Sequence, residues 1–537
     1  MPCGLMSSSY PSGIYPSQDR NGQDLLLEDS NPGNDPSWTD GAVLEMSRNW
    51  APIDAVVGGT EFVRRNARVF IPQEPKENDD AYKRRTAYAV LSPFTQRLAE
   101  QAAGLILRKG VQLQPKDDAA EINSVWEEFS EDVDGNGSSL DSYARRLAIS
   151  SILYGHAGTL VDFPATEAAP NLAVERQLGL RPYFVHVDAK QFLGWRRLSD
   201  SAVAPLGQVR IDEIVSEPKG EFGDDLVRNI RILDYDETGQ ARFRVFRRGD
   251  SSDSTGGWHV YQEGTISINK IPLAVTYSNK VAELVSKPPL LSIANLNLLH
   301  CSTQTDLSHA LRVAALPILV LKGFDDTDNE IGLSANSAIL MSTDGSAEYV
   351  EPVGQGSFNA QAAFIKELEG QMSRLGISTL YSQMNSPETA ESKMLTRTDS
   401  DSLLSIVSKD LQASLQEALD MAGQFLGIEA PMVTISRDFD LQTLDANQVA
   451  QYLALWQNGA ITQSTLLTYL RDGEILPNID IDLEVEMTDQ EKISNMAMLP
   501  QAMQDQAVAE APAAQDDKSE DESSETLEEA AVNELAA

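Results

Sequence analysis

Cysteine is scarce in this chain, which has only two cysteines in 537 residues. Cys3 and Cys301 are too few for a disulfide framework and form no CxxC pair, so the sequence suits a reducing compartment. The N-terminus lacks a basic segment followed by an apolar one, and we therefore expect no signal peptide. The longest apolar run, Val313–Leu321, has nine residues, whereas a helix that spans a bilayer needs about 20. We expect no membrane contact.

The motifs of several enzyme classes are absent as well. No Gly-Lys dipeptide occurs, which excludes a Walker A loop for nucleotide phosphates, and the HExxH, GxSxG and GxGxxG patterns are missing. Of the five histidines, only His300 and His309 lie near one another in the sequence. A metal site needs three or four converging ligands, so these two are better interpreted as ordinary helix histidines. The sequence predicts no catalytic residue, no cofactor, no metal and no enzyme.

Basic residues are in deficit. The chain has 42 Lys and Arg against 81 Asp and Glu, a formal net charge of −39. Affinity for nucleic acid comes largely from Lys and Arg that displace counterions, so a generally basic nucleic-acid binder is excluded. A protein that lies near DNA without holding it is still allowed. The most basic segments are Arg64–Arg68 and Tyr82–Tyr88; the acidic balance favours protein contacts over phosphate contacts for them.

The first half of the chain predicts a mixture of helices and strands. Helical spacing of apolar residues appears over Tyr82–Arg108, with an interruption near Pro93, and again over Ala119–Ser130 and Ser139–Tyr154. Gly155 stands where the last of these helices should end. Apolar and polar residues then alternate between turn signals over residues 160–277, which indicates an antiparallel meander.

The second half begins with a predicted helix over Leu290–Val313 and another over Phe358–Leu375. Short strands are expected between them. Composition predicts mobile or only locally ordered residues over 1–45 and a solvated tail from Gln501, which has eleven acidic residues and one lysine. The remaining expected elements are strands at 317–324, 337–342, 347–352, 432–439 and 480–487 and helices at 445–458 and 462–471.

One long helix with two unlike halves is predicted within Ser382–Gly427. Ser386 is a good N-cap, Pro387 suits the first helical position, and Glu388 complements the helix dipole. The half around Glu391–Asp401 is polar and should border water. The other half has an apolar stripe that should pack against neighbours: Leu404, Val407, Leu411, Leu415, Ala418, Ala422 and Phe425.

The order and spacing of several segments resemble the portal proteins of tailed double-stranded-DNA bacteriophages, in a subgroup catalogued only as a domain of unknown function. No single segment is a sharp signature, and together they cover most of residues 55–440. The segments are "YKRRTAYAVLSPFTQRLAEQAAGLILRKGVQL", "YGHAGTLVDFP", "RPYFVHVDAKQFLGWR", "PPLLSIANLNLLHCSTQTDLSHALRVAALPILVLKGF", "VEPVGQGSFNAQAAFIKELEGQMSRLG" and "ETAESKMLTRTDSDSLLSIVSKDLQASLQEALDMAGQFLG".

The resemblance implies an α+β portal fold with wing, stem, clip and crown regions. In this numbering the regions are a flexible segment at 1–49, the wing at 50–288, a stem helix at 289–315, the clip at 316–352, a second stem helix at 353–377, a tunnel loop at 378–387, the long helix with a wing strand at 388–444, the crown at 445–500 and an acidic disordered tail at 501–537.

The resemblance also implies a function. Portal proteins form a ring of twelve copies at one capsid vertex, through which DNA is packaged and later ejected. The expected partners are other copies of the chain, the DNA, the large terminase, the neck adaptor, the major capsid protein and scaffolding protein. The expected locations are the virion and, during assembly, the host cytoplasm.

The functional residues implied in this way fall into three sets. The tunnel loop would line the DNA channel, basic residues nearby would meet phosphate, and acidic residues of the clip would dock partners. The sets are Ser378, Thr379, Ser382, Gln383, Asn385 and Ser386; Arg374, Lys393 and Arg397; and Asp325, Asp326, Asp328 and Glu330.

Two other classes of function remain open at this stage. One is another ring-forming structural protein of a phage particle, from the neck or the baseplate. The chain is long for a neck adaptor, which is usually much smaller. The other is an enzyme whose site has no familiar motif. A ring with a central hole in images of the purified protein would distinguish the portal from the enzyme.

Overall fold

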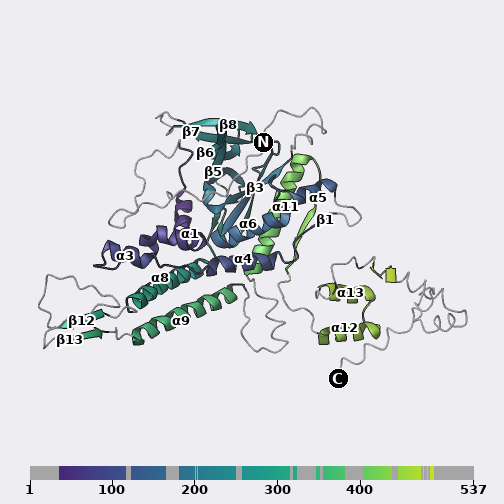
Figure 1. Ribbon diagram of the computed structural model, residues 1–537. Coiled ribbons are helices and arrows are strands. Elements are labelled where there is room, and N and C mark those ends of the chain that lie inside the picture. Colours follow the sequence, from purple (N-terminus) through teal and green to yellow (C-terminus); the bar gives the residue numbers. More distant parts are fainter. Residues whose placement is uncertain are drawn as a thin grey trace, which may run out of the picture. The chain divides into compact units, whose positions relative to one another are not determined.

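The computed structural model (Figure 1) describes residues 35–116, 123–164, 181–199, 201, 204–249, 257–314, 318–322, 346–350, 355–380, 403–437 and 446–472, with six further residues between 476 and 488. The chain divides into two compact units, Met1–Phe439 and Asp440–Ala537, and each is described by itself. Helices and strands both occur, so the α+β class is confirmed at the level of a mixed helix and sheet protein.

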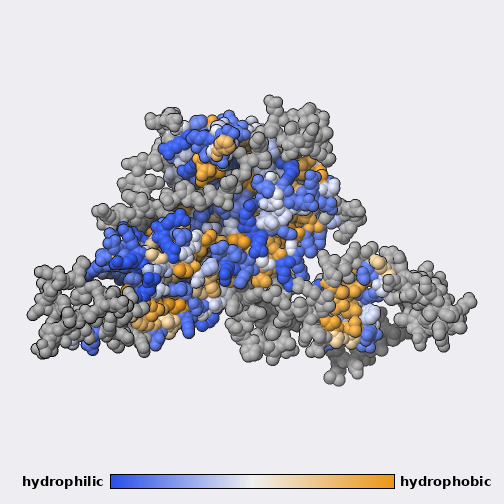
Figure 2. All heavy atoms as spheres, viewed as in Figure 1, coloured by the Kyte–Doolittle hydropathy of each residue, from blue (hydrophilic) through white to orange (hydrophobic). Residues whose placement is uncertain are grey.

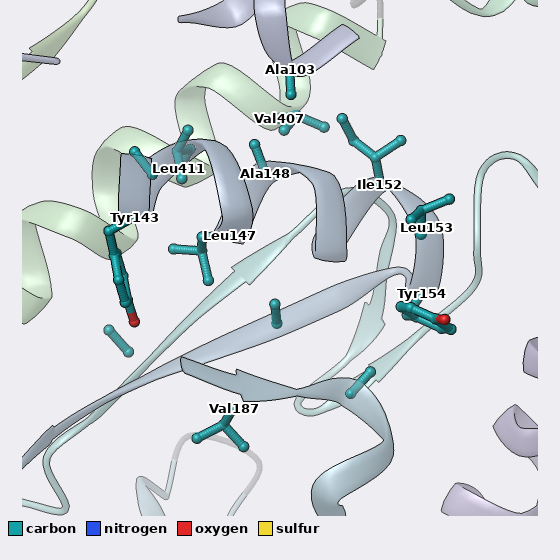
Figure 3. Packing of buried hydrophobic residues seen from close by; sticks show 14 of the residues in the cluster. Ala103, Tyr143, Leu147, Ala148, Ile152, Leu153, Tyr154, Val187, Val407 and Leu411 are labelled. Atoms are coloured by element: carbon teal, nitrogen blue, oxygen red, sulfur yellow. The ribbon is translucent and has the colours of Figure 1, made fainter. Parts of the chain in front are cut away.

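The core of the first unit is a three-stranded antiparallel sheet covered by helices. Its strand order is β3 (Tyr183–Asp188), β2 (His156–Asp162) and β9 (Leu273–Tyr277). Helices α6 (Leu140–Tyr154) and α11 (Leu403–Leu426) lie against it. Figure 3 shows Leu147 and Ile152 of α6 in this cluster, with Val407 and Leu411 of α11 beside them and Ala103 of α4 (Phe94–Ile106) above.

The local signals around α6 explain its ends. The Ser139 hydroxyl accepts a hydrogen bond from the backbone N–H of Ser142 at 3.3 Å, which caps the first turn. At the other end Gly155 has φ 96°, a left-handed conformation, and a Cβ there would lie 2.3 Å from Ser286 Oγ. The predicted helix stop at Gly155 is confirmed. Strand β2 begins directly after it, at His156.

The apolar stripe predicted for the long helix is confirmed in α11. Six of its seven members are almost fully buried, and Phe425 packs against the same core. Helix α11 packs against β9 and β2 of the sheet and against the helices α6 and α4, among other elements. A 24-residue helix with one continuous apolar face gains its stability from this packing more than from propensity.

Residues 160–277 form two sheets, which corrects the single predicted meander. Five consecutive strands make an antiparallel meander, but β2, β3 and β9 form the separate sheet of the core. The reason is that β9 pairs with β2, which lies more than 100 residues earlier in the chain. Alternation of apolar and polar residues predicts that a segment is a strand, but it does not predict which strand pairs with it. The meander consists of β4 (Phe192–Arg197), β5 (Leu206–Lys219), β6 (Gly223–Tyr235), β7 (Ala241–Arg248) and β8 (Trp258–Thr265).

A buried ion network joins the two sheets. Arg231 of β6 lies 2.9 Å from Asp162 of β2 and 2.6 Å from Glu213 of β5. The Tyr183 hydroxyl of β3 donates to Asp162 at 3.2 Å. Burial raises the pKa of Glu213 above its usual value, against the opposing effect of Arg231. Among the residues that the structure describes, Arg231 is the cation that contacts both of these carboxylates.

The expected flexible segment 1–49 is wrong from residue 35 onward. Asp40 accepts from Arg210 at 2.9 Å and from the backbone N–H of Trp195 at 3.1 Å, so the chain is fixed to the five-stranded sheet. Helix α1 (Gly41–Arg65) then begins, and Val43 and Met46 are buried. The polar composition and Pro52 inside the helix concealed its apolar spacing in the sequence.

The remaining elements of the first unit lie around this core. The expected break near Pro93 is confirmed by the gap between α3 and α4, and the helix expected over Ala119–Ser130 is described from Ser124. Strand β14 (Met432–Ile435) pairs with β1 (Val111–Gln114) in an antiparallel two-stranded sheet. The other elements are α2 (Ala67–Phe70), α3 (Asp79–Thr86), α5 (Ser124–Glu131), the short 3-10 helix η1 (Ala189–Gln191), β10 (Lys280–Ala282), β11 (Val285–Ser286), α8 (Leu291–Ala314), β12 (Ile318–Lys322), β13 (Ser346–Val350) and α9 (Gln355–Leu380).

The second unit contains α12 (Ala446–Gln457) and α13 (Gln463–Asp472), close to their predicted bounds. The rings of Tyr452 and Tyr469 stack with centroids 4.8 Å apart. The strand predicted at 480–487 is wrong, because its described residues are helical. Thr488 Oγ1 donates to the carbonyl of Glu484, an i to i−4 contact of a helix. Alternation over so short an acidic segment did not specify a strand.

No helix among the residues described is both long enough and apolar enough to cross a membrane. The predicted strand at 337–342 and the acidic tail from residue 501 lie outside the described residues.

We expect Arg231→Met to lower the free energy of unfolding of the first unit by about 3–5 kcal/mol at pH 7, because it leaves the buried Glu213 and the half-buried Asp162 without a compensating cation. The substitution raises the folded-state pKa of Glu213 further. A raised carboxyl pKa favours the folded state as pH falls, so the deficit should shrink when pH is lowered toward 4.5. Urea titrations at several pH values measure both effects. Arg248→Met, at an exposed position of the same sheet, is the control and should change stability by less than about 0.5 kcal/mol.

Candidate functional site: the α8–α9 rod

Two long helices, α8 and α9, lie side by side and continue into a two-stranded ribbon (Figure 1). The ribbon pairs β12 with β13 in antiparallel register, with Ile318 opposite Val350 and Lys322 opposite Ser346. At 1.5 Å per residue the two helices are about 36 and 39 Å long. We call α8 and α9 the rod. It is the feature that the sequence assigned to the stem.

A buried amide fixes the base of the rod. Asn297 of α8 is fully buried, and its Oδ1 accepts from the backbone N–H and the hydroxyl of Thr95, both at 3.3 Å. Its Nδ2 donates to the carbonyl of Ser92 at 3.0 Å. These groups surround the start of α4, where backbone N–H groups lack helical partners. The amide therefore ties α8 to the first turn of α4.

A buried guanidinium fixes the middle of α8. Arg85 of α3 makes a two-pronged contact with Glu77, at 3.0 and 2.9 Å, and donates to Asp306 of α8 at 2.7 Å. It also donates to the carbonyl of Pro72 at 2.8 Å. The hydrogen bond from Arg85 is the main reason that the pKa of Glu77 lies below its usual value. Planar, paired contacts of this kind hold orientation as well as charge.

The two helices of the rod meet through a mostly apolar seam. Leu368 and Met372 of α9 are almost fully buried. His300 Nε2 of α8 lies 3.3 Å from Glu369 Oε1 of α9. Cys301 is buried beside it, and burial raises the pKa of this thiol to about 11. A thiol with so high a pKa is a poor nucleophile at neutral pH, so it acts as a small apolar side chain.

The outer surface of the rod has exposed apolar side chains and no net charge. Its two helices contain three acidic and three basic residues, whereas the whole chain has a net charge of −39. Figure 2 shows hydrophobic residues at this surface. Because this surface has no net charge, two copies of the chain could associate through it with little electrostatic repulsion. The exposed apolar side chains, with 39% to 59% of their area accessible, are Leu299, Leu311 and Val313 of α8 and Phe364 and Leu375 of α9.

The predicted site residues are only partly within the described chain. Arg374, a proposed phosphate contact, is exposed on α9 and lies 2.9 Å from Glu367 of the same helix. Its charge is therefore largely balanced locally. Ser378 and Thr379 belong to the last turn of α9. The others lie outside the described residues: Ser382, Gln383, Asn385, Ser386, Lys393, Arg397, Asp325, Asp326, Asp328 and Glu330.

Helix α9 extends beyond its predicted end, which corrects the proposed start of the tunnel loop. The sequence analysis ended the periodic helix at Leu375 and began the loop at Ser378, but α9 continues to Leu380. A Cβ at Gly376 would lie 3.4 Å from the side chain of Leu98. This is an ordinary van der Waals distance, so Gly376 lies inside α9 beside α4 and does not end the helix.

Sequence reasoning missed the residues that hold the rod in place. Asn297 and Arg85 stand in helical segments where polar residues usually face water. The only available signal was a pair of asparagines, Asn295 and Asn297, among the apolar residues of "IANLNLL". Their partners, Thr95 and Asp306, are about 200 residues away along the chain, so the sequence alone could not pair them.

The histidines do not gather into a metal centre. His156 is fully buried, its Nδ1 lies 2.7 Å from Ser286 Oγ, and burial lowers its pKa to about 4. It is neutral at physiological pH and packs between aromatic rings of Trp50 and Phe192. Within the described part of the chain, no three His, Cys, Asp or Glu side chains converge as metal ligands.

Residues 289–426, which include the whole rod and α11, match a family described as "Domain of unknown function (DUF4055)". No curated protein matches the chain.

Three solved structures are similar to the chain at low identity. A chain in the neck of the native gene transfer agent particle, with C12 symmetry, is 10% identical with a TM-score of 0.36; the match covers 81% of this chain and 94% of that one. A chain in the neck of the empty particle, with C6 symmetry, is 11% identical with a TM-score of 0.35, covering 70% and 88%. A chain in the virion of the native particle is 12% identical with a TM-score of 0.33, also covering 70% and 88%.

We expect Asn297→Ala to lower the free energy of unfolding of the first unit by about 2 kcal/mol, because it leaves the buried N–H and hydroxyl of Thr95 and the carbonyl of Ser92 without partners. Thr303→Ala is the matched control on the same helix, since Thr303 is only half-buried and its hydroxyl makes a solvent-exposed hydrogen bond to the carbonyl of Leu299. Urea unfolding measures both. Equal losses in the two variants would contradict the anchoring role of Asn297.

Proposed function

We propose that the protein is a portal protein of a tailed double-stranded-DNA phage, a ring of about twelve copies that forms the DNA channel at one capsid vertex. The observation that carries the proposal is the rod. A pair of long helices without net charge, held to an α+β body by Asn297 and Arg85 and continued by a small ribbon, matches the order of stem and clip in the resembled family. The assignment of the other ranges to wing, crown and tunnel loop stays a prediction.

The charge distribution supports a passive conduit. DNA that must slide through a pore needs walls that do not hold phosphate, and strong attachment comes from unpaired Lys and Arg. Arg374 is ion-paired along its own helix at 2.9 Å. The guanidinium of Arg312 lies 4.2 Å from the ring centre of Tyr88, against the body. An acidic chain with balanced cations on the rod repels DNA weakly and releases it.

The proposal assigns the chemical work of packaging to other proteins. With no nucleotide loop in the sequence, the packaging ATPase would be the large terminase, which docks on the ring, and the neck adaptor would dock later. The acidic residues at 325–330 are the proposed docking set. The ring would reside in the virion after assembly in the host cytoplasm, next to major capsid and scaffolding protein. The protein itself would not be an enzyme and would need no cofactor.

A second candidate is another ring-forming structural protein of the neck or baseplate. The exposed apolar side chains of the rod favour self-association without specifying a position in the particle. The two candidates differ in their partners, because only a portal binds the terminase. Co-sedimentation of rings with the terminase distinguishes them.

We expect electron micrographs of the purified protein to show rings of about twelve copies with a central hole. Phosphate release from ATP by homogeneous rings should stay at background, with and without duplex DNA. A monodisperse monomer would contradict the portal proposal, and sustained ATP turnover would contradict the assignment of a passive conduit.

We expect Gln383→Arg combined with Asn385→Arg to leave rings intact and to slow DNA packaging strongly, since two added cations in every copy would hold phosphates in the channel. The matched control is Gln262→Arg with Thr265→Arg, which adds the same charge to exposed positions of β8. Packaging assays at two salt concentrations measure the effect, which should weaken at high salt. Normal packaging by the first variant would place residues 383–385 away from the DNA.

A further inference from the structure

The β5–β6 hairpin projects beyond its sheet. Strand β4 pairs with β5 only as far as Ile211, and β7 pairs with β6 only from Asn229 onward. Six residue pairs, from Ile214 opposite Arg228 to Lys219 opposite Gly223, therefore have no third strand beside them. At about 3.3 Å per residue this two-stranded arm is about 20 Å long. Isolated two-stranded hairpins are only marginally stable in water, so the arm would gain stability from packing against another surface.

The tip of the arm is both apolar and acidic. Phe222 is 93% exposed and Leu226 is 68% exposed, which is unusual for side chains of this size. Glu221 and Asp224 flank them and are exposed. Lys219 and Asp225 form their own ion pair at 2.6 Å, so the remaining charge of the tip is negative.

A basic groove lies elsewhere on the same unit, between α2 and α3. Its volume is about 420 Å³, within the range of sites that hold an aromatic group. Apolar atoms of Val69 and Tyr82 line it together with four cations. Figure 2 shows a hydrophilic surface around α3. The cations are Arg64, Arg65, Arg68 and Lys83, and Asp79 is the single acid of the lining.

The groove brings together the two most basic segments of the sequence, for which protein contacts were expected. Two of the four cations are already engaged: Arg64 contacts Glu61 at 3.1 Å and the carbonyl of Ala89 at 3.0 Å, and Arg65 donates to the carbonyl of Glu61 at 3.4 Å. Arg68 is 78% exposed and lies 3.8 Å from Asp79, a long and exposed contact. Lys83 is exposed and has no ion pair among the described residues. Two cations thus remain available in a chain that is otherwise strongly acidic.

We propose that the tip of the β5–β6 arm of one copy docks into the basic groove of the next copy, with Phe222 between Val69 and Tyr82 and with Glu221 and Asp224 against Arg68 and Lys83. The inference deepens the proposed ring, because a contact between two different surfaces of one chain is heterologous and generates a closed ring when its rotation closes. Charge and hydrophobicity match on both sides. A phosphate ligand would use the cations but not the apolar lining, so a protein tip fits better than DNA.

The experiment is a charge swap in the full-length chain. Arg68→Glu with Lys83→Glu reverses the groove, and Glu221→Lys with Asp224→Arg reverses the tip. Each reversal places like charges against each other and should weaken assembly at least tenfold, measured as the concentration at which half the chains are in rings by analytical ultracentrifugation. The two reversals combined in one chain restore opposite charges and should bring that concentration back to within about threefold of the original. Phe222→Ser should weaken assembly without the salt dependence of the charge reversals.

The matched control reverses two exposed cations outside the groove, Arg97→Glu with Arg145→Glu, and should leave assembly unchanged. Thermal unfolding of every variant verifies the fold, which exposed substitutions should preserve. If either reversal leaves assembly unchanged, or if the combined variant is not restored, the arm does not occupy the groove.

The outcomes separate this inference from the proposed function. Normal rings from both reversed variants would overturn the docking contact and leave the portal proposal standing. Open polymers in place of rings, still dependent on tip and groove, would overturn the ring and support the contact. A chain that stays monomeric at all concentrations would overturn both.

Discussion

The position of the rod depends on one buried amide. Asn297 is hydrogen-bonded on both sides of its amide, to Thr95 and to Ser92, in a place from which water is excluded. A buried polar group that is fully paired costs little, whereas one that slips by a turn loses several hydrogen bonds at once. Apolar packing alone would tolerate sliding of α8 along α4. The amide and the Arg85–Asp306 contact restrict α8 to one register and one direction.

The same principle recurs where the two sheets meet. Apolar faces hold each sheet in its layer, and Arg231 of the five-stranded sheet adds an ion pair to Asp162 of the three-stranded one. Buried ion pairs add little net stability compared with apolar replacements, and their contribution is to discriminate against wrong arrangements. The body of this protein thus combines a large apolar core, centred on α6 and α11, with a few charged or amide groups that fix geometry between its parts.

The sequence predicted the elements whose signals are local. Ser139 and Gly155 mark the ends of α6, the apolar stripe marks α11, and Pro93 marks the break before α4. The sequence did not predict features that depend on a contact with a residue far away in the chain. The pairing of β9 with β2, the packing of Gly376 beside Leu98, and the convergence of Arg68 with Lys83 all depend on residues far apart in the chain. Among the functional features, the sequence predicted the two long helices of the rod from their lengths and their order in the chain. It did not predict that Asn297 and Arg85 fix α8 in place, because a sequence does not distinguish a buried polar side chain from an exposed one.

Alkylation of Cys301 can measure the local opening of α8. The Cys301 thiol of α8 is buried in the core of the first unit, and burial raises its pKa to about 11, which leaves almost no thiolate at neutral pH. Alkylation requires both exposure and ionisation, so a reagent can modify it only while α8 has separated from its neighbours. The rate at which Cys301 is alkylated therefore measures how often α8 opens away from the residues packed against it.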